Sequence, residues 1–95
     1  MIAKQIVKHL MEKIGFRQVD MVESLDKQFG QQVTVQSLNE RISTRRSTSL
    51  TTANLNMMLH VLGYKVVVMP QGLPTPSGSF ELDDGLTPKA EGETK

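Results

Sequence analysis

Residues 33–42 read VTVQSLNERI, and the interpretation of the whole chain depends on this stretch. Val35, Leu38 and Ile42 recur at helical spacing, which predicts a short helix of about nine residues with one apolar face. Thr34 precedes this helix, and its hydroxyl is suited to accept a hydrogen bond from an exposed amide of the first turn. The side chains left to project outward are polar: Gln36, Ser37, Asn39, Glu40 and Arg41.

Two longer helices are predicted before this stretch. The first has an apolar stripe formed by Ile2, Ile6, Leu10 and Ile14, which Val7 and Met11 widen, and it ends at Gly15. The second begins near Arg17 and stops at Gly30. Its inward face is expected to hold Val19, Val22, Leu25 and Phe29, with Met21 as a candidate further member.

A polar loop and a fourth helix are predicted after the short helix. The loop, STRRSTS at 43–49, has no apolar residue and carries the adjacent Arg45 and Arg46. Thr51 is expected to cap the fourth helix, and Gly63 to end it. The apolar positions of this helix follow helical spacing and are Leu55, Met58, Leu59 and Leu62.

The residues that follow Gly63 favour a single β-strand. Tyr64 to Met69 is dense in β-branched residues and is closed by Pro70. An unpaired strand edge needs a partner, and the same strand of a second copy is one candidate. The alternative is a hairpin within the chain, through the Pro-rich loop to residues 80–82.

Charge divides the chain at Pro70. Lys and Arg against Asp and Glu give 9 − 5 = +4 for residues 1–70 and 2 − 5 = −3 for residues 71–95. The second part is Pro- and Gly-rich with few large apolar side chains, so it is interpreted as a disordered acidic tail. Residues 1–70 are expected to form the folded domain. The tail is a candidate contact for a protein partner, with Phe80 and Leu82 as a candidate docking segment.

Several classes of protein are disfavoured by composition. The chain has no cysteine, no signal-peptide pattern and no apolar run long enough to span a membrane, so a cytoplasmic, nucleoid-associated protein is expected. His9 and His60 fall on separate predicted helices, without metal-binding spacing, and no Gly-rich phosphate loop occurs. We therefore expect no enzymatic activity and no cofactor or metal.

The polar face of the short helix suits double-stranded DNA. Gln and Asn side chains can pair with adenine, Arg with guanine, and Glu can accept from cytosine. Arg45 and Arg46 directly follow this helix, where they are placed to neutralise phosphates.

Two segments resemble a known family. VTVQSLNERI, at 33–42, resembles the recognition helix of lambda-repressor-like regulators of the Xre and Cro type. LTTANLNMMLHVLGYKVVVMP, at 50–70, resembles the closing helix and strand of small phage and mobile-element members, so the likeness covers residues 17–70. The chain departs from the family in the turn, where DKQFGQQ separates Leu25 from Val33, about six residues more than the common pattern. These residues either lengthen the second helix by a turn or rebuild the connection.

The resemblance implies a mainly α fold: a four-helix helix-turn-helix domain with one C-terminal strand that pairs in a homodimer, then a flexible tail. The implied function is a transcriptional regulator that binds a palindromic operator, and a repressor is the expected kind. Gln18 and Thr34 would lie near phosphates, Val35, Gln36 and Glu40 would face bases, and Arg41, Arg45 and Arg46 would flank the groove. The dimer would be held by Tyr64, Val66, Val67, Val68 and Met69.

An interaction module on the same fold is the alternative function. Such a protein would bind another protein instead of DNA, as an antitoxin or antirepressor does. A toxin-like reading frame beside the gene would favour this alternative, whereas a divergent promoter with inverted repeats would favour the regulator.

Overall fold

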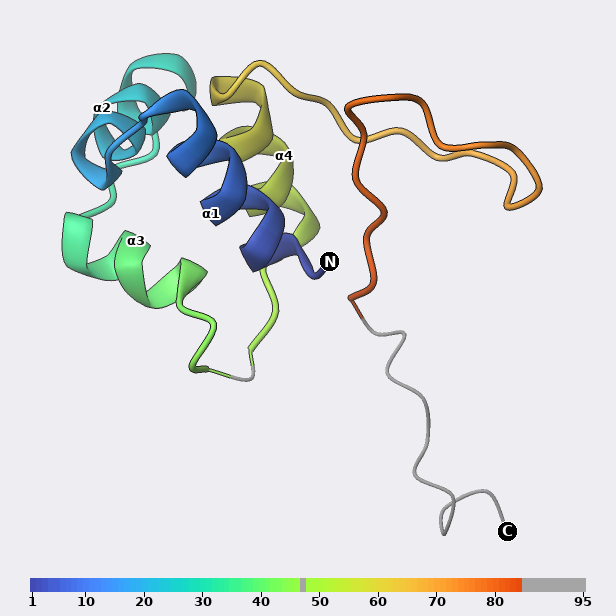
Figure 1. The fold of residues 1–95 in the computed structure, drawn as a ribbon. Helices are drawn as coiled ribbons and strands as arrows, with labels where there is room; N and C mark the ends of the chain where they lie inside the picture. The colour runs from blue at the N-terminus through green and yellow to red at the C-terminus, as the bar shows by residue number, and fades with distance from the viewer. Residues whose placement is uncertain (47, 85–95) are drawn as a thin grey trace, which may run out of the picture.

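A computed structural model describes residues 1–46 and 48–84 of the chain. Within that part, the secondary structure is entirely helical and comprises α1 (Ala3–Ile14), α2 (Gln18–Phe29), α3 (Val35–Ile42) and α4 (Thr52–Val61). Figure 1 shows α1 and α4 side by side, with α2 and α3 at one end of this pair. Both α1 and α2 contact α3 and α4, so the four helices form one small compact domain.

The helix ends lie where glycine and threonine predicted them. Gly15 and Gly30 follow α1 and α2 in the left-handed conformation, with φ of 78° and 66°, which glycine adopts without a steric penalty. Thr34 Oγ1 accepts from the amide of Ser37 at 3.0 Å, and Thr51 Oγ1 accepts from that of Asn54 at 3.2 Å. These hydroxyls satisfy amides that have no partner within the first turn of α3 and α4.

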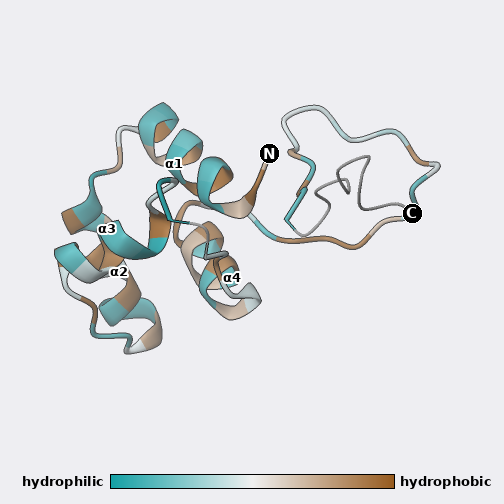
Figure 2. Ribbon diagram, turned by 90° about the horizontal axis from the view of Figure 1, so that it is seen from below, coloured by the Kyte–Doolittle hydropathy of each residue, from teal (hydrophilic) through white to brown (hydrophobic). Residues whose placement is uncertain are grey.

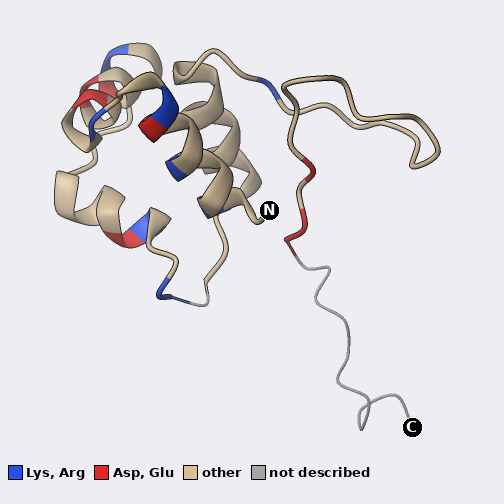
Figure 3. Cartoon of the chain, in the orientation of Figure 1, with Lys and Arg blue, Asp and Glu red and all other residues tan. Residues whose placement is uncertain are grey.

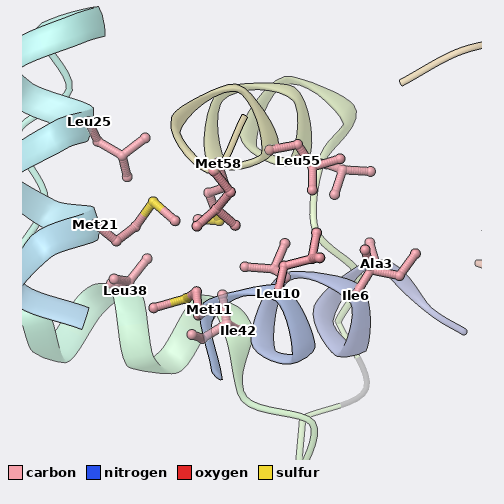
Figure 4. Packing of buried hydrophobic residues seen from close by; sticks show 13 residues of the cluster. Ala3, Ile6, Leu10, Met11, Met21, Leu25, Leu38, Ile42, Leu55 and Met58 are labelled. Atoms are coloured by element: carbon pink, nitrogen blue, oxygen red, sulfur yellow. The ribbon is translucent and has the colours of Figure 1, made fainter. Parts of the chain in front are cut away.

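The core lies where the four helices meet (Figure 4). Its centre includes Leu10 of α1 and Leu38 of α3, both with no exposed side-chain surface. Met21 of α2 and Met58 of α4 point into the same space. The other buried apolar residues are Ala3, Ile6, Val7, Met11, Leu25, Ile42, Leu55, Leu59 and Leu62.

The prediction for the inward face of α2 was wrong at two positions. Val19 and Phe29 are 38% and 37% exposed, whereas Met21 and Leu25 are buried. At 100° per residue, Val19 points about 120° away from Leu25, so the two cannot share a narrow contact face. Phe29 lies in the last turn, where its ring meets that of His60 with centroids 5.6 Å apart.

Similar corrections apply to the ends of α1. Ile2 precedes the helix and is 37% exposed, and Ile14, its last residue, is 51% exposed. The predicted stripe is therefore buried only at Ile6, Leu10 and their neighbours, in the middle of the helix.

The residues between Leu25 and Val33 divide between the end of α2 and a short connection. This helix runs to Phe29, and residues 30–34 connect it to α3. The helical part of this stretch extends to Phe29, and the connection to α3, Gly30 included, is five residues long.

The predicted strand at 64–69 does not form in the described part of the single chain. The segment is extended but belongs to no β-ladder, and Val67 and Val68 are 59% and 96% exposed. A strand is defined by hydrogen bonds to a neighbouring strand, and residues 80–82 do not supply them here, because they lie against α1. Figure 2 shows the hydrophobic colour continuing along this segment outside the helices.

Residues 80–84 return to the beginning of α1. The Phe80 ring meets that of His9 with centroids 5.4 Å apart, and Leu82 stays 44% exposed. The amide of Ala3 donates to Asp84 Oδ1 at 2.6 Å, and Asp83 pairs with the terminal amine of Met1. The carboxylate of Asp84 thus accepts a hydrogen bond at the N-terminus of α1, where the helix dipole favours negative charge. The remaining part of the predicted disordered tail, 85–95, lies outside the described residues.

Candidate nucleic-acid interface

The outward face of α3 is fixed by two core residues. Leu38 and Ile42 are 0% and 1% exposed, so they hold one side of this short helix against the other three. The residues between them and at either end remain accessible: Gln36, Asn39, Glu40 and Arg41 are exposed, and Ser37 is half-buried. Val35 is 43% exposed and adds an apolar surface at the start of the face.

The beginning of α2 lies beside this face. Gln18, the first residue of α2, donates from Nε2 to Oδ1 of Asn39 at 3.1 Å. The two side chains are 21 positions apart in sequence, so the packing of α2 on α3 brings them together. The hydrogen bond restrains Asn39, while its NH₂ group keeps two donors for a ligand.

The loop after α3 brings arginines to the same surface. Arg46 Nη2 lies 3.8 Å from Glu40 Oε1, although both side chains are more than half exposed. Such an exposed pair contributes little to stability, and either partner can exchange it for a ligand. Arg41 and Arg45 are exposed as well. Residues 35–46 therefore carry three arginines and one glutamate, a charge of 3 − 1 = +2.

Charge is unevenly distributed over the molecule, as Figure 3 shows. In contrast to α3 and its loop, α2 has three acidic residues and one lysine, a charge of 1 − 3 = −2. Asp20, in its first turn, accepts from the backbone amide of Arg17 at 2.9 Å and from its guanidinium at 3.3 Å. The guanidinium lowers the pKa of Asp20 below its ordinary value, and the carboxylate raises the pKa of Arg17. Accessible positive charge thus distinguishes α3 and its loop from α2, although α1 also presents the exposed Lys13 and the half-buried Lys8.

The structure brings together most of the residues predicted for DNA contact. Gln18 contacts Asn39, and Glu40 contacts Arg46. Thr34 lies at the N-terminus of α3, but its hydroxyl is engaged by the Ser37 amide, so only the remaining exposed amides of that turn are open to an anion. The residues predicted for dimerisation lie apart from this face, after α4, and all but Tyr64 are exposed.

Lys4 was missed by the sequence interpretation. Its side chain is only 2% exposed, and its ammonium reaches the loop that carries the arginines. A signal was present, because Lys4, Val7 and Met11 follow helical spacing on the inward face of α1. A lysine on such a face must find hydrogen-bond acceptors inside the fold.

Comparison with protein-family models, curated proteins and solved structures finds no match to this chain. Within the described residues, no helix is both long and apolar enough to cross a membrane. The same residues contain no group of three or more His, Cys, Asp or Glu side chains arranged to hold a metal ion.

Proposed function

We propose that the chain is a sequence-specific, double-stranded DNA-binding regulator of transcription. In this proposal α2 and α3 form a helix-turn-helix unit of the lambda-repressor-like kind, and α3 enters the major groove. The protein binds a palindromic operator as a homodimer and acts as a repressor of a phage or mobile element.

One observation carries the proposal: the exposed polar face of α3 is continuous with the beginning of α2 and with residues 43–46, which include Arg45 and Arg46 and are called the arginine loop below. Gln36, Asn39 and Glu40 offer amide and carboxylate groups of the kind that distinguish base edges. The hydrogen bond between Gln18 and Asn39 joins α2 to this face. Arg45 and Arg46 then supply charge at its end, which favours phosphate contacts.

Selection of bound sequences from a random pool of duplex DNA tests the proposal directly. The purified full-length protein should enrich one motif, with two half-sites related by a two-fold axis and spaced about one helical turn apart. If no motif is enriched even at low salt, the DNA-binding proposal is wrong, and a protein partner becomes the better hypothesis.

The proposed dimer is held by the extended segment from Tyr64 to Met69. Val67→Pro removes a backbone donor from the expected strand pair and restricts φ, so we expect monomers and a loss of operator affinity. Sedimentation velocity measures the mass. The matched control is Ser77→Pro. The amide of Ser79 donates to the backbone oxygen of Pro76 at 3.1 Å and Gly78 has φ of 82°, so residues 76–79 form a turn that accepts proline at its second position. An unchanged dimer mass in Val67→Pro would place the interface elsewhere.

The arginine loop should contribute affinity without sequence preference. Replacing Arg45 and Arg46 together with Ala should weaken binding to all duplexes about equally and reduce the salt slope by roughly one unit per lost phosphate contact. Titrations over a range of salt concentrations provide both quantities. Lys27→Ala with Lys65→Ala, two exposed cations outside α3 and its loop, should leave the slope nearly unchanged. An unaltered slope in the arginine variant would assign the pair to a solvated loop.

A further inference from the structure

Lys4 connects α1 to the arginine loop from inside the protein. Its Nζ donates to the backbone oxygen of Ser43 at 3.0 Å and to that of Arg46 at 3.3 Å. Ser43 directly follows α3, and Arg46 is the second arginine of the loop. One side chain therefore holds both ends of the four-residue segment 43–46 against α1.

The environment makes this contact costly to break. The Lys4 side chain is 2% exposed, and a buried ammonium is tolerated only where it keeps hydrogen-bond partners. The C-terminal end of α3 favours a cation, because the last carbonyls of a helix carry partial negative charge. The backbone within the loop adds only weak contacts: the amides of Arg45 and Arg46 donate to Ser43 atoms at 3.4 Å each.

We propose that Lys4 is a positioning residue, which fixes the arginine loop relative to α3 so that Arg45 and Arg46 meet the DNA backbone already ordered. This inference rests on the proposed function. Lys4 itself touches no DNA, because its ammonium is buried. Without it, the two arginines keep their charge, but the loop must be ordered at the moment of binding.

Lys4→Met tests the inference, because methionine keeps an unbranched apolar stem and removes the ammonium. The segment 43–46 should become more mobile on the fast timescale that ¹⁵N relaxation reports. Affinity for duplex DNA should fall by about three- to tenfold, which is the cost of ordering long side chains on binding. The salt slope should stay unchanged, unlike in the variant that lacks Arg45 and Arg46, because the same phosphates are still neutralised. Lys4→Arg keeps donors at this position and should restore much of the loss.

A double-mutant cycle separates positioning from a general loss of stability. In the background without Arg45 and Arg46, Lys4→Met should lower DNA affinity by less than twofold if it acts through these arginines. An equal loss in both backgrounds would overturn the inference. So would a 43–46 segment as ordered in Lys4→Met as in the unmodified protein.

Two further measurements separate a failure of the positioning role of Lys4 from a variant that does not fold and from a failure of the proposed function. If Lys4→Met does not fold, ¹⁵N relaxation of the unmodified protein decides: a 43–46 segment that moves independently of α3 overturns the inference, and one as rigid as α3 supports it. If the unmodified protein binds no duplex DNA, the proposed function fails, and the DNA part of this inference fails with it. Relaxation of Lys4→Met then still shows whether Lys4 orders the loop.

Discussion

Leu38→Ala is expected to lower the free energy of unfolding by about 2–5 kcal/mol, the range for truncating a fully buried leucine. Leu38 has no exposed side-chain surface, and it lies where α3 meets α2 and α1 (Figure 4). Its removal costs apolar burial and leaves a cavity beneath the proposed reading helix. Since small domains have a total stability of about 5–15 kcal/mol, this loss is a large fraction of the free energy of unfolding.

Urea denaturation followed by circular dichroism measures this loss. The matched control is Val35→Ala in the same helix, because Val35 is 43% exposed and its truncation leaves no enclosed cavity. We expect the control to change the stability by less than about 1 kcal/mol. A Leu38→Ala variant as stable as the control would mean that α3 is not anchored through this residue.

The helices could be predicted from the sequence because their ends depend on local chemistry. Gly15 and Gly30 end α1 and α2 in the left-handed conformation, and the hydroxyls of Thr34 and Thr51 cap the helices that follow them. Each of these features involves residues within five positions of one another. The spacing of apolar residues also predicted most of the core, except near the helix ends, where Ile14 and Val19 remain exposed.

Contacts between distant residues could not be predicted in this way. The hydrogen bond of Gln18 with Asn39 depends on the packing of α2 against α3, and that of Lys4 with Ser43 spans 39 positions. The return of Asp84 to α1 likewise depends on the path of the segment between them. The strand predicted at 64–69 had the right composition, but its formation depends on a partner that local sequence does not specify.

Gln36→Ala is expected to remove about 1–3 kcal/mol of binding free energy on the preferred operator, while affinity for unrelated DNA barely changes. Gln36 is exposed on α3, and its amide can donate and accept at one base edge. Losing that pair affects only duplexes that carry the matching base. Gln18→Ala should instead lower both affinities together, because a residue that positions the protein on the backbone reads no sequence.

Parallel titrations with the selected operator and with an unrelated duplex of the same length distinguish these results. Gln28→Ala is the control for Gln36, since it removes an exposed amide from the C-terminal end of α2, outside the proposed interface, and should alter neither affinity.

Glu40→Gln tests the proposal in the opposite direction, because this substitution should raise one of the two affinities. It removes a negative charge that repels phosphates and frees Arg46 from its ion pair, so affinity for unrelated DNA should rise while preference at one base pair weakens. If neither Gln36 nor Glu40 changes the ratio of the two affinities, α3 does not read the bases, and specificity must come from another surface of the protein.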